Sequence, residues 1–246
     1  MDAIIYAAGR ARRLDRFSEG KTKILLEFGG RSLLERHVDL LARLRVSKIH
    51  VVTGYLHEQV QAVLPLLASR YGVVVEEIYN PDFLEGSVLS MEVSLPTIQR
   101  AQEPILLMDG DVLYHSSMLR QLMDAESPTA LLVDTAFSKA DDDPVLVPMN
   151  RGRPFEFVKM WRGESERLGE SVGFFKLDPR DIPKLVEETR IRCVPERRSE
   201  SYDEVLRALV RDGRFGAVDV TGIPWTEIDF PSDITRAERE ILPKLD

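Results

Sequence analysis

The stretch that decides the fold is DAIIYAAGRARR, residues 2–13, in which a short apolar run passes into small residues and then into arginines. An uninterrupted apolar run of this length is typical of a buried strand in a parallel sheet. We expect the strand to cover 2–7 and to lead into a tight loop that ends near Lys23. Small residues at such a turn let the backbone approach a ligand closely.

Downstream of this loop, apolar segments of strand length alternate with segments of helical periodicity. Strands are expected at 48–53, 73–79 and 104–108, and helices at 33–44, 56–69 and 87–98, the first of them with Ser32 and Glu35 as a capping box. Such alternation predicts an α/β fold, Rossmann-like, with a mixed, mostly parallel sheet flanked by helices.

The pattern changes from Ala130 onward. Strands are expected there at 131–135, 144–149, 155–160 and 171–177 without helices between them, and helices return at 182–191, 201–211 and 232–241. We interpret the middle stretch as a small β-rich insertion within a single domain that spans 1–246.

Composition limits the function classes. The 246 residues are 43% hydrophobic and 30% charged, as in ordinary globular proteins, and the net charge of -8 does not favour a nucleic-acid partner. The single cysteine, Cys193, allows no intramolecular disulfide, and the apolar start is too short to span a bilayer. We therefore expect a cytoplasmic protein without membrane insertion; a homodimer stays open.

The loop after the first strand is basic, with Arg10, Arg12, Arg13, Arg16, Lys21 and Lys23 crowded into the first 23 residues. Backbone amides and fixed cations at such a turn bind phosphate oxygens, and a triphosphate would match this set. The loop is neither a Walker motif nor a dinucleotide fingerprint, because their lysine and glycine patterns are absent. An exposed basic loop that binds nothing explains the same residues equally well.

Two acidic clusters lie far apart in the chain. Asp109-Gly110-Asp111 follows the strand at 104–108, at the sheet edge where ligands of open α/β sheets bind, and Glu227-Ile228-Asp229 alternates so that both carboxylates share one face. Magnesium takes a few carboxylates together with phosphate oxygens and water, so the two clusters could hold one ion. Turn formation at Asp109 or Asp111 and helix capping by Asp229 are the alternatives, although Ser232 is a good N-cap and frees Asp229.

The order of these segments resembles a known superfamily. Ala-Ala-Gly at 7–9, Thr-Lys-Ile-Leu-Leu at 22–26, Gly-Ser at 86–87, Asp-Gly-Asp at 109–111 and Trp-Thr-Glu-Ile-Asp at 225–229 resemble the nucleotidyltransferases of the sugar-phosphate and choline-phosphate cytidylyltransferase superfamily. The resemblance covers nearly the whole chain and is closest in character to bacterial phosphocholine, inositol-phosphate and phosphonate cytidylyltransferases. It implies a fold of the nucleotide-diphospho-sugar transferase type, with 1–129 as the nucleotide-binding part and 130–246 as the part that binds the acceptor and supplies the second metal ligand.

The resemblance also implies roles for individual residues. Catalysis would rest on Lys23, Arg13, Asp111 and Asp229, and the last two would bind Mg²⁺ as metal ligands. Nucleotide contacts would come from Ala7, Ala8, Gly9, Arg10, Arg13, Lys23, Gly54, Tyr55, Gly86, Ser87 and Asp109, and acceptor contacts from Tyr114, Glu170, Trp225 and Glu227. The chain has Thr22 where the family usually has proline and Ala11 where glycine is common.

The implied reaction is attack of an acceptor phosphate or phosphonate oxygen on the α-phosphorus of CTP, with pyrophosphate as leaving group. Transfer to a sugar 1-phosphate and a non-catalytic nucleotide-binding regulatory module are the two competing functions. Aromatic residues at 114, 161, 174, 175 and 225 could form a cage for a quaternary ammonium group, with Glu156 or Glu170 adding charge, but an aromatic core is the simpler explanation. The four histidines are expected to be structural.

Overall fold

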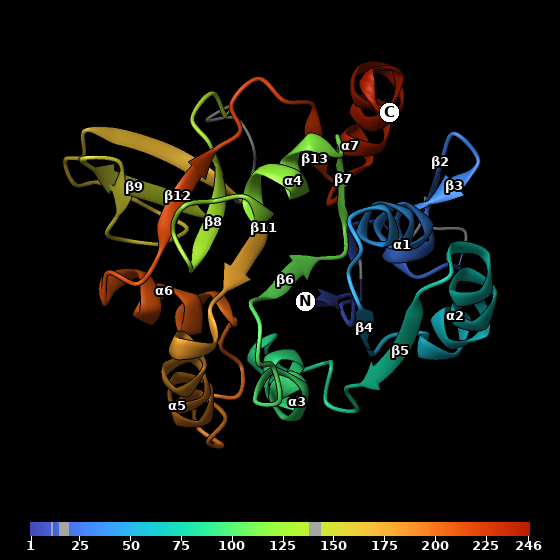
Figure 1. The fold of residues 1–246 in the computed structure, drawn as a ribbon, viewed down its shortest axis with the longest axis horizontal. Helices are drawn as coiled ribbons and strands as arrows, with labels where there is room; N and C mark the ends of the chain where they lie inside the picture. The colour runs from blue at the N-terminus through green and yellow to red at the C-terminus, as the bar shows by residue number, and fades with distance from the viewer. Residues whose placement is uncertain (11, 15–19, 138–143) are drawn as a thin grey trace.

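The apolar opening stretch forms β1 (Asp2–Tyr6) at the centre of the main sheet. It pairs in parallel with β4 (Lys48–Thr53) on one side and with β6 (Ile105–Asp109) on the other, as Figure 1 shows around the N-terminus. Ala3, Ile4 and Ile5 have no exposed surface, because helices cover both faces of the sheet at this point. The computed structural model describes residues 1–10, 12–14, 20–137 and 144–246. Ala11, Arg16 and the side chain of Arg12 lie outside what it describes.

The sheet is mixed and has the order β10-β9-β11-β6-β1-β4-β5, with β8 and β12 joined to it through β11. Its parallel half ends at β5 (Val74–Tyr79), and β11 (Arg167–Leu177) runs antiparallel to β6, β8 and β9. The other strands of this sheet are β8 (Ala130–Asp134), β9 (Leu146–Asn150), β10 (Arg153–Pro154) and β12 (Gly216–Asp219). The β-rich stretch therefore extends the central sheet rather than standing apart from it.

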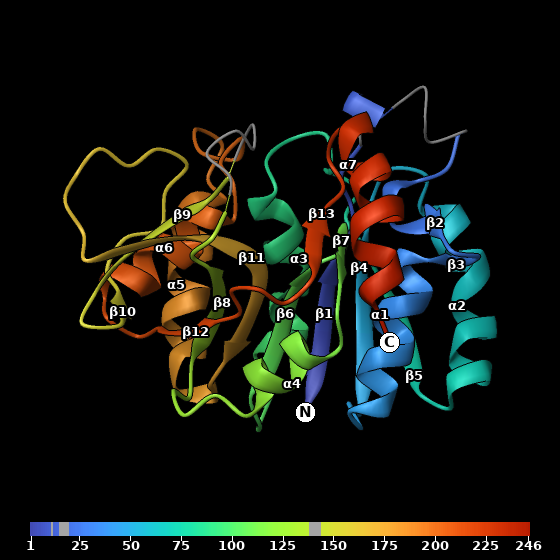
Figure 2. The ribbon, with the colours of Figure 1, turned by 90° about the horizontal axis from the view of Figure 1, so that it is seen from above.

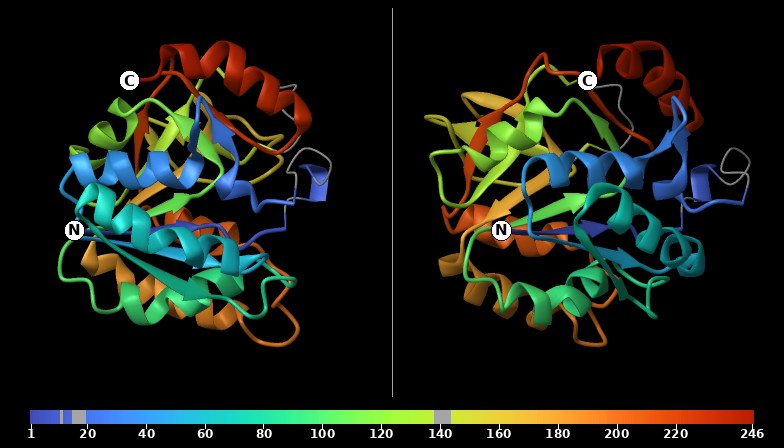
Figure 3. Two further views of the ribbon diagram at one scale, coloured as in Figure 1. Left: turned by 90° about the vertical axis from the view of Figure 1, so that its right-hand side faces the viewer. Right: turned by 45° about the vertical axis from the view of Figure 1, so that its right-hand side comes forward.

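Helices cover the two faces of the sheet in two layers, which Figures 2 and 3 show from above and from the side. One layer packs on the face of the sheet to which Ala3 and Ile5 of β1 point, and it contains α1 (Leu33–Arg43), α2 (His57–Tyr71), α4 (Ser117–Met123) and α7 (Pro231–Arg236). The opposite layer contains α3 (Val88–Ile98), α5 (Ile182–Arg192) and α6 (Asp203–Arg211). None of the described helices has the length and apolar character needed to cross a membrane.

The remaining elements are short. Single turns of 3₁₀-helix lie at Arg12–Leu14, Lys23–Leu25, Pro179–Asp181 and Leu242–Lys244, and a π-helical turn lies at Ala237–Ile241. Two small ribbons accompany them: β2 (Glu27–Phe28) with β3 (Arg31–Ser32), and β7 (Val112–Tyr114) with β13 (Trp225–Glu227).

Most of the expected elements are present within one or two residues, and the differences are local. The segment 155–160 is not a strand, because only Val158 makes a bridge, to Leu146. Ser32 accepts the Glu35 N–H as expected, whereas α7 begins after Phe230 with Pro231 in its first turn, so Ser232 is not its N-cap. The strands β7, β12 and β13 and the helix α4 had no counterpart in the expected elements, since each is too short to show a period.

Candidate active site

The loop after β1 is held by backbone hydrogen bonds to the end of β4. Ala7 donates its N–H to Val52, and the carbonyl of Ala8 accepts the N–H of Tyr55 at 3.0 Å. A side chain at Gly54 would meet this carbonyl, because a Cβ there would lie 2.7 Å from the Ala8 oxygen. Gly54 therefore serves close packing of the loop, while the missing side chain of Gly9 leaves open space.

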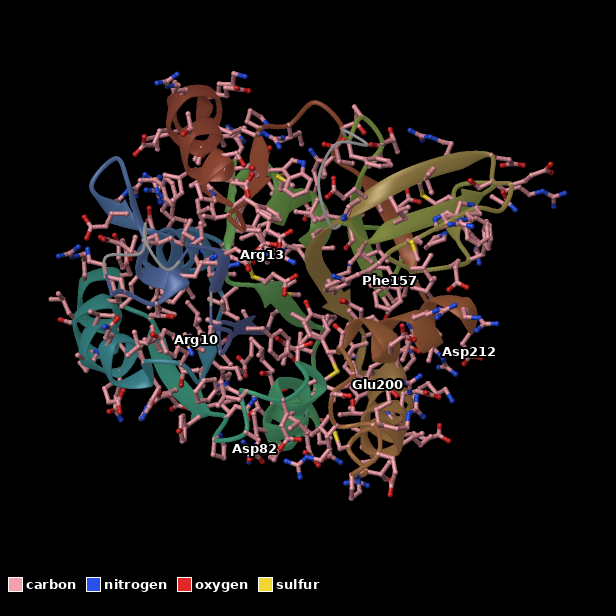
Figure 4. The ribbon with its side chains drawn as sticks, turned by 180° about the vertical axis from the view of Figure 1, so that it is seen from behind. Arg10, Arg13, Asp82, Phe157, Glu200 and Asp212 are labelled. Atoms are coloured by element: carbon pink, nitrogen blue, oxygen red, sulfur yellow. The ribbon has the colours of Figure 1, made fainter. Side chains whose placement is uncertain are left out.

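An open pocket of about 270 Å³ lies over this loop at the carboxyl ends of β1 and β6. Arg10 and Arg13 both line it, and Figure 4 shows them on the side of the N-terminal half of the chain. The complete lining is Tyr6, Ala7, Gly9, Arg10, Arg13, Lys23, Ile24, Gly110, Asp111 and Asp229. The guanidinium of Arg10 lies 5.5 Å from the ring of Tyr55, which places Tyr55 behind the arginine rather than in the pocket.

Lys23 joins the basic loop to the two acidic clusters. Its ammonium nitrogen lies 2.8 Å from Asp111 Oδ2 and 2.5 Å from Asp229 Oδ1. Burial by itself would lower the pKa of Lys23, but the charges of Asp111 and Asp229 outweigh it and raise this pKa above its ordinary value. Three residues that are remote in sequence thus meet in one ion-paired cluster at the floor of the pocket.

The two acidic clusters are tied together by main-chain bonds. Strand β13 pairs antiparallel with β7, and the Ile228 N–H donates to the Asp111 carbonyl at 3.0 Å. As a result, carboxylate oxygens of Asp111, Glu227 and Asp229 lie within 4.8 Å of one another. Desolvation and repulsion from Asp111 and Asp229 raise the pKa of Glu227, although its side chain reaches the solvent of the cleft.

These carboxylates fit a hard divalent cation. Magnesium takes oxygen ligands, and it is usually held by one or two carboxylates together with substrate phosphates. A cation at this position would also relieve the mutual repulsion that raises the pKa of Glu227.

Asp109 faces away from the first pocket. Its carboxylate accepts a hydrogen bond from the Tyr202 hydroxyl, and Gly173, with a φ of +79°, leaves it room, since a Cβ there would lie 2.1 Å from Asp109 Oδ2. Burial, followed by the charge of Asp111, raises the pKa of Asp109 well above its usual range. Asp109, which was expected to contact the nucleotide, lines a second pocket and not the first.

The second pocket, of about 150 Å³, adjoins the first through Asp111 and Asp229. Its walls come from β6, β11, the N-terminus of α6 and the segment around Phe157, which Figure 4 labels on the C-terminal half of the molecule. The lining is Asp109, Asp111, Val145, Phe157, Lys159, Glu170, Ser171, Val172, Gly173, Phe175, Tyr202, Asp203, Glu227 and Asp229. Tyr202 and Asp203 were missed by the sequence reasoning, because they follow no motif and reach the cleft only through tertiary packing.

Two of the four expected acceptor contacts lie elsewhere. Tyr114 is 4% exposed with its hydroxyl on His37, and Trp225 is 8% exposed with its indole N–H bonded to Asp134. Both pack in the core layer around α1 and α4, so neither reaches the second pocket, whereas Glu170 and Glu227 line it.

The aromatic cage does not form among the described residues. Phe174 and Phe175, which are neighbours in β11, point to opposite faces of the sheet, and Trp161 packs against Phe155 with ring centres 5.5 Å apart. The simpler explanation, an aromatic core, holds for Phe174 and Phe175.

Gly86 and Ser87 brace the second pocket instead of contacting the first. Gly86 donates its N–H to the Arg198 carbonyl, and a Cβ at this position would lie 2.2 Å from the Glu200 oxygen. The Ser87 hydroxyl accepts the Tyr202 N–H at 3.0 Å. Gly86 and Ser87, which were expected to contact the nucleotide, fix the segment that carries Tyr202.

Arg13 approaches the second carboxylate oxygen of Asp229, whereas Lys23 bonds to the first. Its guanidinium lies 3.7 Å from Asp229 Oδ2 and 4.7 Å from the ring centre of Phe230. The pocket thus carries cations from the loop after β1 and carboxylates from the segments that follow β6 and β13, an arrangement suited to a polyphosphate and a divalent cation together.

A family model described as the MobA-like NTP transferase domain matches residues 3–175 of the chain. Among curated proteins, the CTP:phosphoglutamine cytidylyltransferase of Campylobacter jejuni is 22% identical, over 95% of this chain and 98% of that protein. The bifunctional IPC transferase and DIPP synthase of Rubrobacter xylanophilus is 29% identical over 98% of this chain, which spans about half, 52%, of that protein.

Solved structures share the fold. The inositol-1-phosphate CTP transferase from T. maritima superimposes with a TM-score of 0.76 and 23% identity, over 99% of this chain and 95% of that one. The CTP:phosphocholine cytidylyltransferase from Streptococcus pneumoniae gives a TM-score of 0.78 and 19% identity, over 96% and 97%.

Proposed function

The chain belongs to the MobA-like NTP transferase family and is a nucleotidyltransferase, and from this premise we propose that it transfers CMP from CTP to a small phosphorylated alcohol or phosphonate. The observation that carries the proposal is the position of Lys23 between Asp111 and Asp229, at the floor of a pocket walled by the loop after β1. The CTP-using relatives and fold neighbours support the choice of nucleotide.

In this proposal the first pocket takes the nucleotide and the second takes the acceptor. The acceptor oxygen is already ionised and attacks the α-phosphorus of CTP, so no general base is needed and catalysis consists of alignment and charge neutralisation. Lys23 and Arg13 neutralise phosphate oxygens, and Gly9 leaves room for them. A magnesium ion held by Asp111 and Asp229 would supply further neutralisation of the triphosphate.

The charges around the second pocket favour an acceptor with a positive group beside its phosphate. The carboxylates of Glu170 and Asp203 line it together with one lysine, Lys159. Asp109 and Glu227 line it as well, but their raised pKa values mean that they add less negative charge. The arginines at 153, 162, 197 and 198 do not line it, and Arg198 pairs with Asp82 and Glu85. A zwitterionic acceptor would match this lining better than a neutral polyol phosphate.

We further propose that 1–246 act as a single domain, with 1–129 supplying the nucleotide pocket and Asp111, and 130–246 supplying most of the acceptor pocket and Asp229. The chain has a single cysteine and so no intramolecular disulfide, which favours a reducing compartment such as the cytoplasm.

A substrate screen tests the proposal directly. Pyrophosphate release is measured with each of the four nucleoside triphosphates and Mg²⁺, against phosphocholine, aminoethylphosphonate, inositol phosphate and several hexose 1-phosphates. We expect turnover with CTP, fastest with the two acceptors that carry a positive group, and none with EDTA. Turnover only with hexose 1-phosphates would replace this function by sugar-1-phosphate nucleotidyl transfer, and CTP binding without turnover on any acceptor would favour a regulatory module.

A further inference from the structure

The turn that carries Asp229 is fastened by a side chain of the next helix. Asp229 and Phe230 lie between β13 and α7, and Asp233 in the first turn of α7 reaches back to them. Its Oδ2 accepts the N–H of Asp229 at 2.9 Å and that of Phe230 at 2.7 Å. Because a carboxylate that accepts two backbone N–H groups makes strong, charge-assisted bonds, the main chain at Asp229 is held from both ends.

The side chain of Phe230 continues this arrangement toward the basic loop. Its ring lies under the Arg13 guanidinium at 4.7 Å, and Asp229 lies 3.7 Å from the same group. Arg13 is otherwise a half-exposed side chain, 51% accessible, on a single 3₁₀ turn. Two consecutive residues from the C-terminal part thus hold an arginine from the N-terminal loop over the first pocket.

The ring of Phe230 does not belong to the hydrophobic core. Of the residues that the structure describes, those of the two hydrophobic core clusters do not include Phe230, and it is only partly buried. A phenylalanine that is placed outside the core, beside a cleft and against a guanidinium, is explained by the contact it makes.

We propose that Phe230 and Asp233 are positioning residues for the nucleotide: Asp233 sets the turn that presents Asp229, and Phe230 holds Arg13 where the triphosphate binds. The inference rests on the proposed function, since it assumes that Arg13 and Asp229 face the phosphates. Neither residue touches the reacting atoms, so both act through a neighbour. Loss of Phe230 affects CTP binding through Arg13, and loss of Asp233 affects it through Asp229.

The test for Phe230 separates CTP affinity from the other steps. Binding of CTP without acceptor is measured by equilibrium dialysis, with and without Mg²⁺, beside KM and kcat. In Phe230→Leu we expect CTP affinity to fall about fivefold and the KM for CTP to rise by the same factor. The KM for the acceptor and the thermal midpoint of the free protein should not change. Phe230→Tyr keeps a ring and should restore the affinity; Tyr79→Leu, on the sheet edge at β5, is the matched aromatic control.

A double-mutant cycle shows whether Phe230 acts through Arg13. In an Arg13→Ala background, Phe230→Leu should cause no further loss of CTP affinity. Additive losses, unchanged affinity in Phe230→Leu, or an equal rise of both KM values would overturn the proposal for Phe230.

Asp233 is tested by the contrast between two substitutions. Asp233→Asn retains an oxygen that accepts both N–H groups and should stay within about twofold of the wild type, whereas Asp233→Ala should raise the Mg²⁺ concentration for half-maximal CTP binding about fivefold. Equal effects of both substitutions would overturn its positioning role. Absence of CTP binding by the wild type would overturn the proposed function as well, whereas normal binding by every variant would overturn this inference alone.

Discussion

The ammonium group of Lys23 forms ion pairs with Asp111 and Asp229, and a third carboxylate, from Glu227, lies within 4.8 Å of both. Desolvation and the charges of Asp111 and Asp229 raise the pKa of Glu227, and a divalent cation with substrate phosphates on it would relieve that repulsion. The residues thus form a cluster that is arranged for a ligand rather than for its own stability.

Replacing either proposed metal ligand tests this arrangement. Asp111→Asn and Asp229→Asn keep the shape of the side chain but remove one charge, and we expect each to lower kcat by at least about a hundredfold, because charge neutralisation of the triphosphate is lost. The free proteins should unfold near the wild-type temperature, since Lys23 keeps its other carboxylate partner. Pyrophosphate release and thermal unfolding are the two measurements.

The exposed Glu126→Gln serves as control for the loss of one negative charge, and it should change neither quantity. Turnover close to that of the wild type in Asp111→Asn or Asp229→Asn would remove that residue from the metal site.

At the residue scale, positions on strand ends and short motifs were predictable from the sequence. Asp111 and Asp229 were expected in one site, and the structure brings them together, because β13 pairs with β7 and the Ile228 N–H bonds to the Asp111 carbonyl. Tyr202 was not predictable, since its contact with Asp109 depends on how the segment after α5 crosses Gly86. Tyr114 and Trp225 were expected to contact the acceptor but are buried in the core, because an aromatic residue beside a motif can face the core as readily as the cleft.

At the scale of elements, α1 is fastened to the turn that carries Asp111. His37, in the middle of α1, bonds to the Gly110 carbonyl through Nε2 and to the Tyr114 hydroxyl through Nδ1, both at 3.2 Å. Gly110 is confined as well, because a Cβ there would lie 2.9 Å from the Tyr6 oxygen. The helix therefore supports the acidic turn from below the pocket, as the structural role expected for this histidine implies.

Acidification should weaken this contact. Complete burial lowers the pKa of His37 to about 4, against the smaller opposing effects of the Gly110 carbonyl and Asp111. Between pH 6.5 and 4, His37 is protonated in the unfolded chain but neutral in the folded one. The free energy of unfolding therefore decreases as the pH falls through this range. We expect His37 to account for a loss of about 2 kcal/mol between pH 7 and pH 5.

Urea unfolding at the two pH values measures this loss. In His37→Gln, whose side chain does not titrate, the free energy of unfolding should decrease less between pH 7 and pH 5, and the difference from the wild type should equal the loss assigned to His37. An equal decrease in both proteins would contradict a neutral, buried His37.

Elements with a clear period were predictable, and those whose form depends on tertiary pairing were not. Strand β4 was expected at 48–53 and has these bounds, because it is buried on both faces. The segment 155–160 has an apolar composition but bonds only through Val158, so its burial comes from packing of Phe157 in the core rather than from a ladder. Strand β7 has three residues and exists because β13 pairs with it.

At the scale of the whole molecule, the site joins distant parts of the chain. Lys23 is 88 residues from Asp111 and 206 residues from Asp229, so the cluster forms only when the loop after β1, the end of β6 and the segment after β13 are all in place. A ligand that binds this cluster binds the folded state alone and stabilises it by mass action. The net charge of -8 makes the local basic loop, rather than the overall field, responsible for attracting a small anion.

Thermal unfolding should therefore report how Lys23 and magnesium share the carboxylates. In the wild type the ammonium already pairs with Asp111 and Asp229, so Mg²⁺ alone must displace it and should raise the midpoint by little. CTP gives Lys23 phosphate partners, so CTP with Mg²⁺ at about a hundredfold over its Kd should raise the midpoint by about 5–10 °C. The increase should exceed the sum of the two separate effects.

For Lys23→Met we expect the opposite response of the midpoint to Mg²⁺ alone. Without the ammonium, the carboxylates repel one another, so the free variant should lose about 1–2 kcal/mol of stability, discounted for the partial exposure of the cluster. Mg²⁺ alone should then restore the midpoint, because the cation occupies the place that the ammonium has left, while turnover stays low for want of a phosphate partner. The control Lys21→Met removes an exposed lysine that pairs with Glu27 and should respond to Mg²⁺ like the wild type. If Mg²⁺ alone stabilised the wild type and Lys23→Met equally, the ammonium and the metal would not share these carboxylates, and the cation site would have to lie elsewhere in the cleft.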